Sequence, residues 1–153
     1  MTPEGHAALL AEVNHLKTVE RPRISKEIGV AREHGDLREN AEYHAAKEKQ
    51  GMVEARINQI EDSISRADVI DASTFTGDKV KFGAYVSLED TDSGKKVRYR
   101  IVGPDEADLK KGTISVSSPI ARALIGRKVG DEVTVNAPGG ERVYEIVEVA
   151  WVA

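Results

Sequence analysis

The sequence predicts a two-domain α+β protein, in which a helical hairpin precedes a small domain built on an antiparallel sheet. From Lys79 onward, Val-rich alternating segments separated by Gly, Pro and Asp are typical of short strands. Before them, a set of mostly apolar positions recurs in alternating steps of three and four, the spacing by which two helices wind around each other as a coiled coil. These positions are Tyr43, Ala46, Gln50, Val53, Ile57, Ile60, Ile64 and Ala67.

The first helix is predicted to begin near Thr2 or Pro3, because threonine favours the cap position and proline the first helical position. Pro22 lacks a backbone donor and clashes with the preceding turn, so we expect a kink or a new helix start there. The apolar stripe of the first helix consists of Leu9, Leu10, Val13 and Leu16.

A further helical segment is predicted before Gly35, where Ile24, Ile28 and Ala31 repeat the same spacing. Glycine is a poor residue inside a helix and a good helix stop. The next helix should run from about residue 40 to residue 67. The connection between the two is so short that they must lie antiparallel, which places residues 36–39 at the tip of a hairpin.

The second domain reads as strands around one short helix, which predicts a small α+β domain with an antiparallel sheet. A helix over residues 119–125 should be capped by Ser117 or Ser118 and stopped by Gly126. The strands are expected over residues 79–88, 95–102, 114–116, 131–135 and 143–149.

The charge composition divides the chain near Ser73. Residues 1–73 carry ten basic and fourteen acidic side chains, a net charge of −4, whereas residues 74–153 carry twelve of each. We therefore predict a hairpin domain over residues 1–73 and a globular domain over residues 74–153. Residues 72–78 read as a short linker of turn-forming residues.

The composition also argues against several classes of protein. The chain has no cysteine, which excludes disulfides and thiolate metal sites and suits a reducing cytoplasm. No apolar run is long enough to span a membrane, and the first residues lack the features of a signal peptide. We expect a cytoplasmic protein with no membrane partner. The overall net charge of −4 argues against autonomous, tight binding to phosphate backbones.

Asp36 and Glu39 lie three positions apart at the predicted tip, and two interpretations are open. In the first, Asp36 caps the following helix and Glu39 reaches back to it, as in a capping box at the positive end of the helix dipole. In the second, both carboxylates help to hold a divalent cation. Mg²⁺ takes few protein carboxylates and keeps several waters, so such a site would be weak and would need ligands from another protein.

Two long ordered segments resemble the Gre family of bacterial transcript-cleavage factors. Residues 31–44 read Ala-Arg-Glu-His-Gly-Asp-Leu-Arg-Glu-Asn-Ala-Glu-Tyr-His, and residues 114–122 read Ile-Ser-Val-Ser-Ser-Pro-Ile-Ala-Arg. The Pro-Gly-Gly-Glu of residues 138–141 is also similar to the family. The resemblance covers nearly the whole chain. It implies an N-terminal antiparallel coiled coil joined to an FKBP-like globular domain.

The resemblance also implies a transcription elongation factor that acts on RNA polymerase. Its hairpin would enter the secondary channel and bring Asp36 and Glu39 to the magnesium site, where backtracked nascent RNA is cleaved. Asp36 would then hold a weakly bound second Mg²⁺ and Glu39 would orient the attacking water, while the polymerase holds the first ion. The chain would act as a monomer, would stimulate cleavage without being an enzyme itself, and would hold no Mg²⁺ tightly alone. It would meet the RNA 3′ end and DNA only within the elongation complex.

Other residues near the tip are weaker candidates. Arg32, Arg38 and Lys47 would contact extruded RNA or the channel walls, or else form a solvated helix face. Tyr43 is the first position of the seam, so we expect it to pack there, with contact to RNA as the alternative.

Histidines and the short helix add two further expectations. His34 and His44 flank the tip, but their spacing matches no metal motif, so both are expected to be structural or solvated. Ser117, Ser118 and Pro119 should start the short helix, and the resemblance implies that this surface also docks on the polymerase.

Two other functions remain open. A Gre-like protein that occupies the channel without cleavage would act as an inhibitor or competitor, although the intact pair of Asp36 and Glu39 argues against it. A chaperone or prolyl isomerase would suit an FKBP-like domain. Its few aromatic residues lie mostly within strand patterns, however, and fold alone does not establish function.

Overall fold

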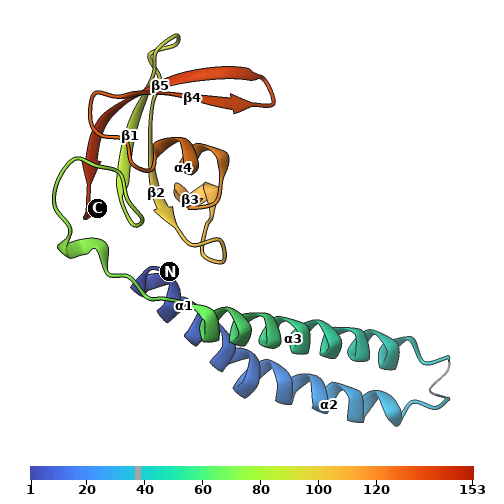
Figure 1. Cartoon of the computed structure of the whole chain (residues 1–153). Coiled ribbons are helices and arrows are strands. Elements are labelled where there is room, and N and C mark those ends of the chain that lie inside the picture. Colours follow the sequence, from blue (N-terminus) through green and yellow to red (C-terminus); the bar gives the residue numbers. More distant parts are fainter. Residues whose placement is uncertain (37–38) are drawn as a thin grey trace. The chain divides into compact units, whose positions relative to one another are not determined.

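The computed structural model describes residues 1–36 and 39–153, and its two-domain α+β architecture confirms the predicted fold class (Figure 1). One compact unit comprises residues 4–67 and is helical. The other comprises residues 68–153 together with residues 1–3 and contains the sheet. None of the helices in the described part of the chain is both long and apolar enough to cross a membrane.

In the helical unit, α2 and α3 lie side by side and run antiparallel (Figure 1). A kink or a new helix start is expected at Pro22, but the backbone stays helical from α1 through η1 into α2, which begins at Arg21 with the proline in its first turn. The segment before α2 is π-helical, a local widening of the helix. The helices are α1 (Pro3–His15), η1 (Leu16–Glu20), α2 (Arg21–Arg32) and α3 (Ala41–Arg66).

The predicted seam of α3 faces the preceding helices. All eight of its positions are buried or half-buried, whereas most other residues of α3 are exposed. Ile24, Ile28 and Ala46 form one buried cluster, against which Tyr43 and Val53 pack. The alternating spacing of three and four residues therefore predicted the buried face of this helix correctly.

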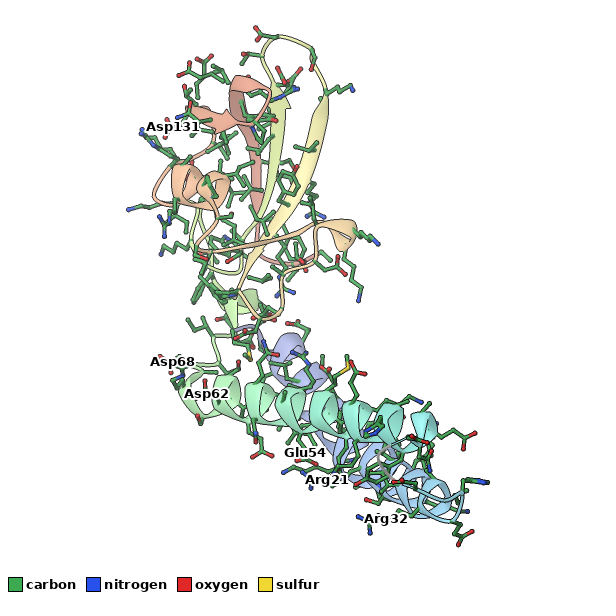
Figure 2. All side chains as sticks on the ribbon, turned by 90° about the vertical axis from the view of Figure 1, so that its right-hand side faces the viewer. Arg21, Arg32, Glu54, Asp62, Asp68 and Asp131 are labelled. Atoms are coloured by element: carbon green, nitrogen blue, oxygen red, sulfur yellow. The ribbon has the colours of Figure 1, made fainter. Side chains whose placement is uncertain are left out.

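Two bidentate ion pairs join α3 to the earlier helices. Arg21 donates from Nε and Nη2 to the two carboxylate oxygens of Glu54 at 2.8 and 2.9 Å. Figure 2 labels both side chains on the hairpin. Arg56 makes the same arrangement with Glu12, at 2.8 Å for both bonds. The hydrogen bonds from Arg21 lower the pKa of Glu54, and those from Arg56 lower the pKa of Glu12. Both pairs fix how the helices are aligned along the hairpin.

The globular unit contains one five-stranded sheet in the order β3-β2-β1-β5-β4. Its core side chains come from alternate strand positions and from α4, which covers one face of the sheet (Figure 1). Val86, Leu88, Ile101, Ile146 and Leu124 of this core are fully buried. The elements are β1 (Tyr85–Asp90), β2 (Lys96–Val102), η3 (Leu109–Lys111), β3 (Thr113–Ser115), α4 (Pro119–Leu124), β4 (Glu132–Ala137) and β5 (Gly140–Ala150).

The sheet is mixed, so the prediction of an antiparallel sheet is wrong for one strand pair. β3 runs parallel to β2, with Arg100 opposite Thr113 and Val102 opposite Ser115. Parallel neighbours need a crossover connection, and residues 103–112 provide it by returning the chain to the level of Arg100, so that β3 pairs with the last three residues of β2. The three other strand pairs are antiparallel, as expected.

Residues 1–3 are held on the globular unit by a polar clamp that the sequence did not predict. The backbone N–H of Thr2 donates to both carboxylate oxygens of Glu106, at 3.2 and 2.9 Å, and its hydroxyl donates to the same carboxylate. Glu106 also accepts from the N–H of Gly103 at 3.1 Å. The Met1 carbonyl accepts from the N–H of Ile70 at 2.9 Å, which continues the attachment. Thr2 is only 2% exposed as a result.

Asp90 should make the free energy of unfolding of the globular unit fall at acidic pH. Its buried carboxylate accepts hydrogen bonds from the backbone N–H groups of Asp92 and Ser93 and from Arg142, and these, led by the Asp92 bond, lower its pKa. A lowered native pKa means that the unfolded chain binds more protons. The stabilisation is therefore present above the pKa of the unfolded state and is lost as the pH falls through the native pKa.

Between about pH 6 and about pH 2, the range in which carboxyl groups ordinarily titrate, the free energy of unfolding of the globular unit should fall. We expect Asp90→Asn to make this slope against pH shallower. Urea unfolding followed by the fluorescence of Trp151 measures this free energy at each pH. Asp105→Asn, at an exposed position, serves as the control. Equal slopes for the Asp90 variant and the unmodified chain would contradict the assignment.

Candidate functional site

The hairpin tip begins where α2 ends. The N–H groups of Glu33 and His34 donate to the carbonyls of Val30 and Ala31, each at 3.1 Å, and complete the last turn. Gly35 follows with a φ of +117°, a conformation that residues with a side chain rarely adopt. The predicted role of Gly35 at the end of the helix is thereby confirmed.

Asn40, which the sequence argument did not single out, organises the other side of the tip. Its backbone is extended and its side-chain oxygen accepts from the N–H of Tyr43 at 3.0 Å, so it is the N-cap of α3. Its side-chain amide donates to the carbonyl of Ala31 at 2.5 Å, which ties the end of α2 to the start of α3. Its side-chain type and its place directly before the helix are the sequence signals for this role.

The capping-box interpretation of Asp36 and Glu39 is therefore wrong. The helix starts at Ala41, one residue after its asparagine cap, so Asp36 lies too early to be the cap and Glu39 precedes the cap. Asparagine caps a helix as well as aspartate does, which left the position of the helix start ambiguous in the sequence. The N-cap of α3 is thus Asn40, and neither Asp36 nor Glu39.

Asp36 and Glu39 lie together at the end of the hairpin. Both side chains are exposed, and the N–H of Glu39 donates to the carbonyl of Asp36 at 3.3 Å. An open hollow of about 400 Å³ is lined by both acids together with His34, Asn40, Ala41 and Glu42. Arg38, predicted to contact RNA or the channel, lies outside the described residues.

The hollow is dominated by carboxylates, three from the residues that line it, and this favours cations. His34 Nε2 lies 3.8 Å from a carboxylate oxygen of Glu42, so this histidine faces an acid at the rim. Within the described ranges, no group of three or more His, Asp or Glu side chains is placed to hold a metal ion. The two tip carboxylates offer the hard oxygen ligands that Mg²⁺ prefers, but too few for its octahedral shell, so water or another molecule must supply the rest.

Residues behind the tip mostly pack against the hairpin. Tyr43 is half-buried against the cluster of Ile24, Ile28 and Ala46, in agreement with the packing expected of it. The Arg32 guanidinium carbon lies 5.9 Å from the centre of the Tyr43 ring, and the ring of His44 meets the Tyr43 ring edge-on at 5.6 Å. The exposed Lys47 donates to the side chain of Gln50 at 3.1 Å along α3.

The predicted docking residues lie at the start of α4 in the globular unit. Ser118 caps this helix, because its hydroxyl oxygen accepts from the N–H of Ala121 at 3.3 Å, and Pro119 is the first helical residue. The hydroxyls of Ser117 and Ser115 lie 2.8 Å apart. The predicted capping is confirmed, while docking on the polymerase stays a prediction.

Comparison with known proteins matches both parts of the chain. Residues 1–69 match the family described as "Transcription elongation factor, N-terminal", and residues 75–150 match "Transcription elongation factor, GreA/GreB, C-term". Transcription elongation factor GreA of Hyphomonas neptunium is 59% identical over 151 residues, which cover 99% of this chain and 96% of that protein. Its counterpart in Anaeromyxobacter sp. is 62% identical over 152 residues, which cover 99% of this chain and 92% of the relative.

The chain is also similar to a solved structure, the crystal structure of GreA factor homolog 1 (Gfh1) of Thermus thermophilus. The two sequences are 29% identical and the TM-score is 0.44, over 97% of this chain and 96% of the Gfh1 chain. The sequence matches thus assign both units to one class of protein, the transcription elongation factors. The chain belongs to the GreA/GreB family of these factors.

We expect Asn40→Ala to destabilise the helical unit by about 1–2 kcal/mol, because both the cap of α3 and the bond to α2 are lost. Asn40→Asp is the matched control, since its oxygen can still cap α3 although it cannot donate to Ala31. It should cost less than the alanine variant. Thermal unfolding followed by helical circular dichroism measures both costs. Equal losses for the two variants would show that the cap contributes nothing.

Proposed function

We propose that this transcription elongation factor stimulates RNA polymerase to cleave backtracked nascent RNA, by inserting the hairpin into the secondary channel of the polymerase. One observation carries the proposal. Two exposed carboxylates lie together at the tip, and neither starts the adjoining helix. Family membership supplies the polymerase as the partner, and the shortened RNA would regain a 3′ end in register with the active site.

In this proposal Asp36 and Glu39 complete a site whose other ligands belong to the polymerase. Asp36 would help to hold a weakly bound Mg²⁺ that is shared with the polymerase, and Glu39 would orient the attacking water. When bound, Mg²⁺ supplies activation of water and stabilisation of the leaving oxygen. The asparagine cap and the backbone bond between the two acids hold them close before the partner is met, which reduces the ordering needed on binding.

Other surfaces would hold the factor in place. Arg32 and Lys47 are exposed along the hairpin and would contact RNA or the channel walls through their positive charge. Tyr43 would contribute mainly by supporting Arg32 through its ring. In the globular unit, the start of α4 with Ser117, Ser118 and Pro119 would dock on the polymerase.

The finer architecture forms part of the same proposal. The buried spacing of α3 supports an antiparallel coiled coil, and the resemblance to the Gre family supports an FKBP-like arrangement of the sheet and α4. The chain would act in the cytoplasm as a monomer. It would not be a nuclease by itself, and it would meet RNA and DNA only inside the elongation complex. A factor that merely blocks the channel is not favoured, since it would have no use for a paired set of acids at its tip.

The test is to add the purified chain to a stalled, backtracked elongation complex with Mg²⁺ and to follow RNA labelled at its 3′ end. A short 3′ fragment should be released, and the remaining transcript should resume elongation. The chain alone should cleave no RNA and should bind Mg²⁺ only in about the millimolar range, as sparse carboxylate sites do. Inhibition of elongation without fragment release would support the blocking factor instead, and RNA hydrolysis by the chain alone would overturn the shared site.

A further inference from the structure

A groove runs along one side of the helical hairpin, between α2 and α3. It consists of two hollows of about 450 and about 300 Å³, and Arg23, Glu27 and Lys49 line both of them. Glu42 lines the larger hollow and also the acidic hollow at the tip. The three hollows therefore follow one another along the hairpin. A partner that surrounds the tip would also lie against this groove.

The groove contains apolar side chains that the fold leaves exposed. Val30 of α2 lines the larger hollow and Met52 of α3 lines the smaller one, and these residues are 48% and 68% exposed. The exposed Ala45 also lines the larger hollow. Two buried residues of the seam, Ala46 and Ile24, line the larger and the smaller hollow. Contiguous apolar side chains at the surface are typical of a site that binds another protein.

The apolar side chains of α3 in this groove belong to one flank of its seam. The positions one residue before the seam form a row beside it, with the same spacing of three and four. This row is Glu42, Ala45, Lys49 and Met52. The positions one residue after the seam form the row on the other flank. That row is His44, Lys47, Gly51 and Glu54. The first row contains apolar side chains and the second does not, so the two flanks are suited to different partners.

The charges around the groove favour a protein over a nucleic acid. Among the described residues, three basic and three acidic side chains line it. They are Arg23, Lys26, Lys49, Glu20, Glu27 and Glu42. Lys49 Nζ lies 3.8 Å from a carboxylate oxygen of Glu27 on the facing helix, and Arg23 pairs with Glu20. A phosphate backbone is bound by an excess of positive charge, whereas an apolar centre with a polar rim is typical of protein interfaces.

We propose that this groove is the face by which the hairpin rests on the protein wall of the polymerase channel. The inference rests on the proposed function, because insertion of the hairpin brings a channel wall beside the groove. The wall would supply aliphatic side chains to the hollows around Ala45 and Met52, and charges of both signs to the rim. With the groove covered by protein, Lys47 on the other flank is left for the extruded RNA.

The first test places two polar side chains in the groove of the full chain. Ala45→Gln combined with Met52→Gln should raise the concentration of factor that gives half-maximal cleavage by at least about tenfold, because apolar contacts at the centre of an interface are lost. The cleavage rate at saturating factor should stay within about twofold, since the two tip acids are untouched. Ser25→Gln combined with Gly51→Gln is the matched control. It adds two glutamines at exposed positions that each follow a seam residue, and it should change neither value.

The second test identifies what covers the groove. The chain has no cysteine, so Met52→Cys can carry a photoactivatable crosslinker at a single position. In a backtracked elongation complex with labelled RNA, this variant should crosslink to a polymerase subunit. Gly51→Cys, one residue away on the other flank, should give a weaker crosslink to protein. Crosslinking of Met52→Cys mainly to RNA would show that nucleic acid fills the groove and would overturn the proposal.

The outcomes separate this inference from the proposed function. Circular dichroism confirms that the variants are folded. If the groove variant needs no more factor than the unmodified chain for half-maximal cleavage, or if the control loses as much, the groove proposal alone is overturned. The hairpin would then enter the channel without a preferred face toward protein. Failure of the unmodified chain to bind polymerase would overturn both proposals.

Discussion

Replacing Asp36 by Asn or Glu39 by Gln should lower the rate of transcript cleavage by about 100-fold or more, the usual effect of removing a group that positions or activates water. Each change removes one carboxylate and keeps the size of the side chain. The free energy of unfolding should change by less than about 0.5 kcal/mol, because both side chains are exposed and neither caps α3. Binding to polymerase should be retained. Release of the labelled 3′ fragment from a backtracked complex measures the rate.

The matched control is Glu33→Gln, which removes an exposed carboxylate close to the tip but outside the acidic hollow. It should cleave at nearly the rate of the unmodified chain, so general loss of negative charge would not explain the effect at Asp36 or Glu39. Higher Mg²⁺ should partly rescue Asp36→Asn, since a weakened metal ligand can be offset by mass action. Normal cleavage by either tip variant would remove that residue from the mechanism.

The parts of the fold that were predictable depend on local patterns. A stripe spaced by three and four marks a buried helix face whatever its partner, and Gly35 and Pro22 act within a turn of their own positions. These signals were sufficient for the hairpin and for the location of its acidic tip. The start of α4 was equally readable, because Ser118 and Pro119 combine two local preferences.

The parts that were not predictable depend on contacts between distant residues. Nothing in the sequence of β3 shows that it pairs parallel to β2, because strand direction is decided by the path of residues 103–112. The clamp between Thr2 and Glu106 joins residues that are 104 positions apart in the sequence. At the tip, two acceptable caps lay close together, and the link from Asn40 to Ala31 decided between them.

Gly83→Ala should be among the most damaging single changes in the globular unit, at about 2–4 kcal/mol, since strain and overpacking act together. Gly83 has a φ of +85°, and an added Cβ would lie 2.4 Å from the Cβ of Ala72. Its N–H donates to the carbonyl of Ile101 at 2.8 Å, so the backbone cannot easily move away. The strand predicted from residue 79 begins only at Tyr85, because the chain turns at residues 82–83.

Two other glycines separate the components of that cost. Gly94 also has a positive φ, +72°, but has open space around it, so Gly94→Ala should show the backbone strain alone, about 1 kcal/mol. Gly139 has neither a positive φ nor a close neighbour, so Gly139→Ala should leave the free energy of unfolding nearly unchanged. Urea unfolding followed by the fluorescence of Trp151, the only tryptophan, measures all three. Adding Ala72→Gly to Gly83→Ala should recover the steric part, which a double-mutant cycle isolates. If Gly83→Ala costs no more than Gly94→Ala, the segment around Ala72 is not packed against Gly83 in solution.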